Sequence, residues 1–334
     1  FRGPDLDSAV PAELVAVAGR LNNALRRLGS DWAVFVDAQR YSSNAYPPSS
    51  CPDVASALVD AERRAQFEEE GAHYESAYFL TFLYLPPAED AARAERLLYE
   101  RPERGQAAGA HQVLRGFVDR TDRVLQLVEG FMPECRWLDD GETLTYLHAC
   151  VSTKIHRVRV PEIPMYLDAL LADEALTGGL EPMLGDQHLR VLTIVGFPTA
   201  TTPGILDDLN RLAFPYRWST RAIMLDKADA TKLLTRIRRQ WFAKRKSVAA
   251  ILKEVMTNET SSLIDTDASN KAIDADAALQ ELGSDLIGEA FVTATITVWD
   301  ENPRIADERL RLVEKIIQGR DFTCMVETVN AVDA

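Results

Sequence analysis

The sequence predicts an α+β protein with two sheet-containing lobes and helices packed on the sheets, the second lobe being ferredoxin-like (split β-α-β). Three observations lead to this fold class. The 334 residues are enough for two domains of ordinary size. Segments with helical and with strand periodicity alternate along the whole chain. The second half shows the order β-α-β-α-β-α-β, which suggests a split β-α-β arrangement.

The composition narrows the class of protein. Hydrophobic residues make up 46% and charged residues 26% of the chain, as is typical of a globular protein, and no apolar run approaches the length of a membrane span. The net charge of −14 argues against a general nucleic-acid binder, because phosphate binding needs a basic surface. The four cysteines form no CxxC pair, so we expect reduced thiols in a cytoplasmic protein.

Residues 1–155 are expected to form the first lobe. Val54, Leu58 and Ala61 follow helical spacing and are expected to face inward. Residues 74–85 are apolar on both faces, which predicts a central strand covered on both sides. The expected elements are helices over 11–28, 52–71, 89–99 and 112–129, strands over 32–38 and 74–85, a loop over 40–52, and a hairpin of 135–138 with 143–150 around a turn at 139–141.

Residues 156–186 are expected to be a connector with one short helix, because glycines and prolines interrupt them. Residues 187–334 then form the second lobe. Its expected elements are strands over 189–196, 216–225, 289–299 and 323–329, helices over 204–212, 228–258 and 305–318, and a polar, partly helical stretch over 261–284.

Short pieces of a further pattern are scattered along the chain. They are residues 2–6, Trp32, Arg40, 46–47, 60–63, Phe67, Gly71, 74–75, Tyr78, 80–81, 84–87, 196–198, 203–204, Leu206, 216–218, Arg221, 244–247, 274–277, 293–297 and 327–331. In their order and spacing these pieces resemble the CagE/TrbE/VirB family of conjugal-transfer (type IV secretion) ATPases, and specifically its TrbE-type members. No single piece is decisive, so the order and spacing make the resemblance specific.

The resemblance implies the non-catalytic N-terminal portion of such an ATPase, serving oligomer contacts and docking of the motor to inner-membrane secretion components. Full members of the family are cytoplasmic, peripheral at the bacterial inner membrane and hexameric. Their P-loop domain, which binds ATP and magnesium, is expected to follow this region, and a short upstream segment is expected to precede it. The implied partners are type IV secretion inner-membrane subunits and pilin.

No catalytic, cofactor-binding or metal residue is predicted in this chain. The strings GxxxxGK[ST], GxGxxG, HExxH and GxSxG are all missing from the sequence, so the resemblance transfers no ATP-site residue to any position. The carboxylates and hydroxyls of residues 265–276 are similar to a calcium loop, but Asn270 replaces its glycine and Asp276 its glutamate. We expect a solvated connector there. His148 and His156 lie close enough in sequence to approach each other.

One segment is strongly basic in this acidic chain. Residues 232–246 hold seven basic residues and no acidic one, with apolar residues at helical spacing between them. The interpretation we favour is a helix that packs its apolar stripe on the sheet. The alternatives are contact with an anionic membrane surface, contact with an acidic partner, and a nucleic-acid clamp. The candidate interface residues are Lys232, Arg236, Arg238, Arg239, Trp241, Lys244, Arg245 and Lys246.

Three further arginines, Arg63, Arg217 and Arg221, are expected to have structural or interface roles, because the guanidinium group suits planar bidentate contacts. A separate hypothesis is a stand-alone enzyme or a nucleotide-binding domain with an unrecognised site. That hypothesis requires a cluster of reactive side chains that the sequence pattern does not assemble.

Overall fold

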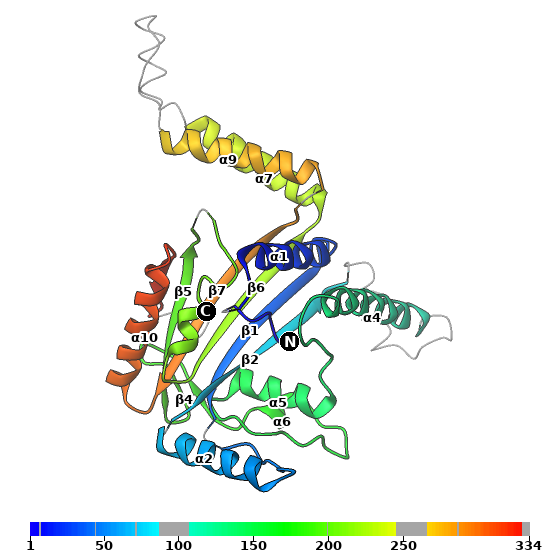
Figure 1. Cartoon of the computed structure of the whole chain (residues 1–334). Helices are drawn as coiled ribbons and strands as arrows, with labels where there is room; N and C mark the ends of the chain where they lie inside the picture. The colour runs from blue at the N-terminus through cyan, green and yellow to red at the C-terminus, as the bar shows by residue number, and fades with distance from the viewer. Residues whose placement is uncertain are drawn as a thin grey trace, which may run out of the picture.

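The computed structural model describes residues 1–328 except 7, 44, 71, 87–106, 199, 245–265 and 286. Helices lie around one curved antiparallel sheet of eight strands, in the order β2-β1-β6-β7-β5-β4-β3, with β8 paired to β5 (Figure 1). This arrangement confirms the predicted α+β class.

Most of the predicted elements appear within a few residues of their expected bounds. The helices are α1 (Pro11–Leu25), α2 (Val54–Glu70), α4 (Ala107–Glu129), α5 (Asp140–Val151), α6 (Leu167–Leu171), the 3-10 helix η1 (Asp207–Arg211), α7 (Lys227–Lys244), α9 (Thr266–Gly283) and α10 (Pro303–Gln318). The strands are β1 (Trp32–Ser42), β2 (Tyr74–Tyr84), β3 (Leu176–Thr177), β4 (Met183–Leu184), β5 (Gln187–Gly196), β6 (Tyr216–Leu225), β7 (Glu289–Asp300) and β8 (Thr323–Val326). The helix expected over 89–99 lies outside the described residues.

Strands from both predicted lobes join in this single sheet. β1 pairs antiparallel with β6, from Ala33 opposite Ile223 to Arg40 opposite Tyr216. Around β5 the strands of the second half lie in the order β6-β7-β5-β8. The connection from β5 to β6 holds the five-residue 3-10 helix η1 in place of the expected α-helix. The ferredoxin-like detail and the lobe boundary therefore stay predictions.

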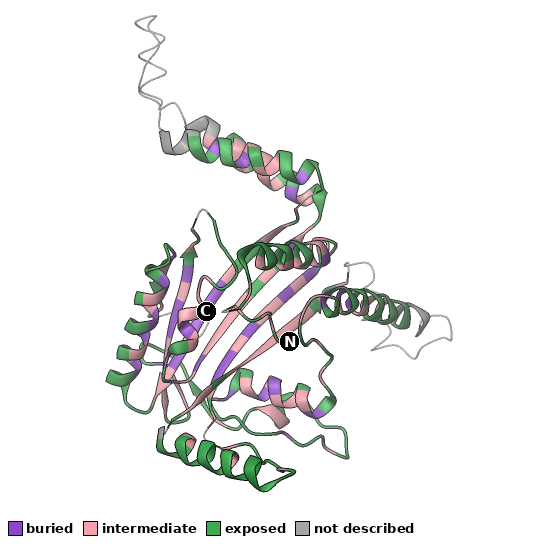
Figure 2. Cartoon of the chain, in the orientation of Figure 1, coloured by how far each residue is buried: buried purple, intermediate pink, exposed green. Residues whose placement is uncertain are grey.

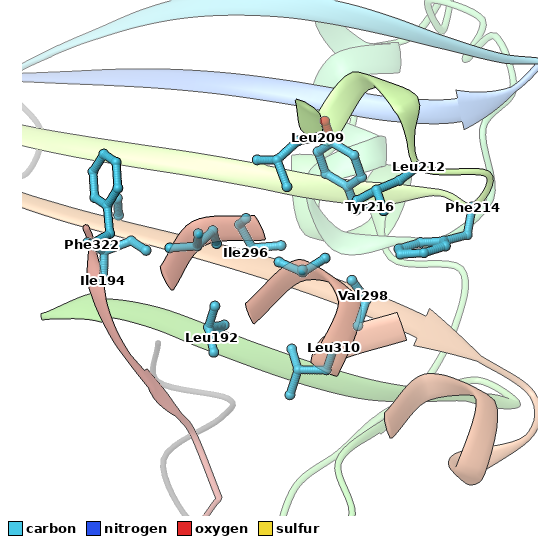
Figure 3. Packing of buried hydrophobic residues seen from close by; sticks show 13 residues of the cluster. Leu192, Ile194, Leu209, Leu212, Phe214, Tyr216, Ile296, Val298, Leu310 and Phe322 are labelled. Atoms are coloured by element: carbon cyan, nitrogen blue, oxygen red, sulfur yellow. The ribbon is translucent and has the colours of Figure 1, made fainter. Parts of the chain in front are cut away.

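Two apolar clusters stabilise the sheet. The first lies where α10 and η1 cover β5, β6 and β7 (Figure 3), and Leu192, Ile296 and Val298 are completely buried in it. The apolar positions of α10 recur every three or four residues, which turns one stripe of the helix to the sheet. The second cluster centres on Trp32 of β1, whose ring stacks on Phe117 of α4 with 5.5 Å between ring centroids.

The predicted hairpin at 135–150 is wrong, because residues 140–151 form helix α5. Asp139 is its N-cap: its side chain accepts a hydrogen bond from the backbone N–H of Glu142, and the Glu142 side chain accepts one from the Asp139 N–H. This reciprocal capping box satisfies two N–H groups that the first turn of a helix leaves free. The acidic pair 139–140 therefore begins a helix rather than forming a turn.

Strand β2 lies at the edge of the sheet, so its predicted central position is wrong. Its two apolar faces have another cause, since helices contact both of them. Leu80 and Phe82 pack on the cluster that includes α4, whereas the ring of Phe79 lies 4.5 Å from the ring of Tyr146 on α5. Apolar residues on both faces of a strand indicate that both faces are covered, but they do not indicate whether the strand pairs with a neighbour on each side.

Helix α2 forms as predicted, but its expected inward residues point outward. Val54 and Leu58 are 87% and 69% exposed, and Ala61 is exposed (Figure 2). The helix is held instead through Asp60, which accepts hydrogen bonds from Tyr46 and Ser49, and through Phe67, which stacks on His73. Those contacts come from the flanking loops and not from the sheet.

Candidate functional site

The strongest candidate for a functional surface is a helical arm between β6 and β7. Helices α7 and α9 lie side by side and extend away from the sheet (Figure 1). Their shared seam is apolar, with Ala230 of α7 and Ala272, Ala275 and Leu282 of α9 buried. The expectation that α7 packs its apolar stripe on the sheet is therefore wrong, because α9 supplies a matching stripe of small residues.

The arm also bears on two predictions for this part of the chain. The partly helical segment predicted over 261–284 contains helix α9, from Thr266 to Gly283. The solvated connector expected over 265–276 is wrong where the structure describes it, because residues 266–276 are helical and do not form the loop that a calcium site requires. Asp276 serves the arm itself, because its Oδ1 accepts from Arg238 Nη1 at 2.8 Å. The ammonium group of Lys271 lies 4.5 Å from the centre of the Trp241 ring. Arg238 and Trp241 thus contact α9.

The opposite side of α7 presents three cations to solvent. Lys232, Arg236 and Arg239 are exposed and recur at spacings of four and three residues, so they share one helix face. They line a groove of about 580 Å³ together with the hydroxyl and amide side chains of Thr231, Thr235 and Gln240. The Nζ of Lys232 lies 3.2 Å from Asp229 Oδ1 in an exposed pair that contributes little to stability. We call Lys232, Arg236 and Arg239 the basic face of the arm.

The remaining predicted interface residues lie elsewhere or outside the described ranges. Lys244 ends α7 and its side chain is not described, while Arg245 and Lys246 lie outside the described residues. Arg63 is exposed on α2, and Arg221 is exposed on β6. The structure does not bring these two arginines to the arm.

Arg217, also on β6, belongs to a buried polar cluster that sequence reasoning missed. Its Nη2 lies 3.3 Å from Asp37 Oδ2, and its Nη1 donates to the carbonyl oxygen of Ala149 at 2.9 Å. Asp37 is 2% exposed and accepts a short hydrogen bond from the hydroxyl of Tyr146. Burial, followed by this hydrogen bond, raises the pKa of Tyr146 above its ordinary value. The available signal was a single aspartate inside the otherwise apolar run of residues 32–38.

Beside this cluster lies a cavity of about 250 Å³ between β2, α4 and α5. Its lining is mostly apolar, with Phe79, Leu80, Phe82 and Phe117 among the contributing side chains. Oδ2 of Asp37 is engaged by the guanidinium of Arg217 and by the phenol of Tyr146, so these side chains brace β1, β6 and α5 against one another beside the cavity.

The predicted approach of two histidines occurs, and it forms part of a packed corner. The rings of His148 and His156 lie 4.4 Å apart, and His148 Nδ1 hydrogen-bonds the carbonyl oxygen of Leu171 at 2.9 Å. Across the described ranges, no three His, Cys, Asp or Glu side chains are placed to hold a metal ion together. In the same ranges, no helix combines the length and apolar character needed to cross a bilayer.

Comparison with known proteins identifies the family to which this chain is related. Residues 1–92 match the family model for the N-terminal domain of the type IV secretion system ATPase VirB4/TrbE. The whole chain is 32% identical over 350 aligned residues to the conjugal transfer protein TrbE of Rhizobium radiobacter, and it spans 42% of that protein's length.

Two proteins of Sinorhizobium fredii (strain NBRC 101917 / NGR234), described as the two parts of a probable conjugal transfer protein TrbE, divide the similarity between them. The first is 37% identical over 100 residues, which cover 67% of that protein and 29% of this chain. The second is 31% identical over 193 residues, which cover 28% of that protein and 58% of this chain. The chain therefore belongs to the VirB4/TrbE family of type IV secretion ATPases, whose N-terminal domain it carries.

Proposed function

We propose that this chain is a non-catalytic docking portion of a TrbE-type secretion ATPase, serving contacts between copies and attachment of the motor to inner-membrane components of the secretion machine. The basic face of the arm carries the proposal. It holds three cations on an arm that stands away from the sheet, in a chain whose net charge is −14. A basic face of this kind favours an acidic protein surface and speeds encounter with it.

Under this proposal, ATP hydrolysis takes place in another region of the whole protein. ATP and magnesium belong to the motor domain, while this chain binds no cofactor of its own under the proposal. The sequence has no phosphate-binding glycine loop, and Oδ2 of the buried Asp37 is engaged by Arg217 and Tyr146. The proposed location is the cytoplasmic side of the bacterial inner membrane, where the protein is peripheral. Pilin is a further proposed partner.

The test places a photo-crosslinking residue at Thr235, which lines the groove beside the basic face, in the full-length ATPase inside conjugating cells. Crosslinks to inner-membrane subunits, to pilin or to another copy of the ATPase support docking. Crosslinks confined to lipid or to DNA would contradict it, and would support the membrane-surface or nucleic-acid interpretation instead. Reversing two charges of the face (R236E/R239E) should remove the protein crosslinks, whereas R304E/R311E makes the same charge change at two exposed positions of α10.

A second measurement separates docking from the enzyme hypothesis. A ligand that binds the folded state raises the melting temperature of a protein. Since this chain has no nucleotide site under the proposal, its melting temperature should stay unchanged when ATP and magnesium are added to the isolated chain. A rise of several degrees would indicate a nucleotide site in this chain.

A further inference from the structure

Helix α2 presents a second exposed surface. Asp60 and Phe67, seven residues apart, hold one side of the helix to its flanking loops. The opposite side carries Leu58, Glu62 and Glu69, together with the small residue Ala65, and all four are exposed. We call these four residues the acidic face of α2. Leu58, at the N-terminal end of this stripe, is 69% exposed.

The acidic face and the basic face of the arm match in charge and in spacing. Glu62 and Glu69 are seven residues apart on α2, and Lys232 and Arg239 are seven residues apart on α7. At 1.5 Å per residue both pairs span about 10.5 Å along their helices. The two faces can therefore lie side by side with each carboxylate opposite a cation, while Arg236 lies opposite Ala65.

The groove on α7 also suits the apolar portion of the acidic face. The side chains that line it are threonines and long cationic residues, whose methyl groups and methylene stems are apolar while their charged ends stay in water. Leu58 can pack on those stems at the end of the charged row. The contact then combines an apolar floor with opposite charges at its rim, as in other protein interfaces.

One molecule cannot make this contact with itself. The arm and α2 lie at opposite ends of the sheet (Figure 1). The partner that supplies the complementary face must then be another molecule, and a second copy of the same chain carries that face. Because the two surfaces differ, the contact is head-to-tail, and repeated contacts close into a ring or continue as a filament.

We infer that the acidic face of α2 in one copy docks on the basic face of the arm in the next copy. The inference rests on the proposed docking function and names the acidic surface that the arm binds. It makes Leu58, Glu62, Glu69, Lys232 and Arg239 the residues that decide self-association. Since opposite charges at exposed sites carry the specificity, association should weaken as salt rises.

The test measures self-association of the full chain by analytical ultracentrifugation at low and at high salt. The variants K232E/R239E and E62R/E69R should each raise the dissociation constant about tenfold or more, because each places like charges opposite one another. The protein carrying all four substitutions should regain the association, since the charges are exchanged between the faces. R304E/R311E should associate like the unsubstituted chain.

Three results would overturn the inference: a chain that stays monomeric at low salt, single reversals without effect, or a fourfold variant that does not recover. Circular dichroism of each variant checks folding, and all four positions are exposed, so the helices should be retained. Failure here is distinct from failure of docking. Crosslinks from Thr235 to an inner-membrane subunit, without self-association through these faces, would leave the proposed function standing and remove the second copy as the partner.

Discussion

Replacing Arg217 by methionine should be one of the most destabilising single changes in the chain. The substitution removes the guanidinium and keeps most of the apolar stem. The side chain of Arg217 is 18% exposed and that of Asp37 is 3% exposed, so the carboxylate would stay buried without its cation. Removing one partner of a buried ion pair costs about 3–5 kcal/mol. We expect a loss of about 3 kcal/mol, because Tyr146 still donates a hydrogen bond to Asp37.

Urea titration measures this loss as a lower midpoint at an unchanged slope. The double variant D37L/R217M gives the decisive comparison. It removes the charge together with its partner, and apolar replacement of a whole buried pair is often neutral. The double variant should therefore be more stable than R217M, with a strongly non-additive cycle. A loss below about 1 kcal/mol for R217M, or a double variant as unstable as the sum of the single changes, would refute this reasoning.

Three further predictions concern the start of α5, the core and the arm. Hydrogen bonds from Arg136 and from the N–H of Asp139 lower the pKa of Glu142 from 4.5 to about 2. The variant E142Q should therefore have a lower free energy of unfolding than the unsubstituted chain at pH 7, and the difference should shrink as the pH falls from about 4.5 to 2. A difference that stays constant with pH would contradict this. I296A should lower the free energy of unfolding, measured by urea titration, by about 2–5 kcal/mol, because Ile296 is completely buried. I273A should lower it much less, because Ile273 on α9 is 63% exposed. A275D should speed amide hydrogen exchange in the arm and leave exchange in the sheet unchanged, because it buries an unpaired charge only between α7 and α9.

Elements with a strong internal pattern could be predicted from the sequence. β6 appears at its predicted bounds of 216–225, and α10 begins two residues before its predicted start at Ile305. In both, the residues that face the core recur with one clear period, so the local pattern and the tertiary contacts agree. Helix α5 was missed because its β-branched and aromatic residues favour a strand, while the capping box at 139–142 stabilises a helix.

The candidate site, too, could be predicted from the sequence only in part. The basic character and the helical period of residues 232–246 were evident from the sequence, and they identify a basic amphipathic helix. The identity of the element that covers its apolar stripe was not evident, since the seam residues of α9 lie more than thirty positions away along the chain. The pairing of Asp37 with Arg217 was equally hidden, because it joins β1 to β6 across 180 residues.

The sequence by itself determined the family of this protein, its α+β class and the positions of its most regular elements. These properties depend on residue types in order along the chain, which local periodicity and resemblance both record. Only the tertiary structure decided that β2 lies at an edge, that α7 packs on α9 and that Leu58 of α2 points to solvent. An apolar stripe indicates that one face of a helix is to be buried, but the element that buries it depends on how distant segments of the chain meet in space.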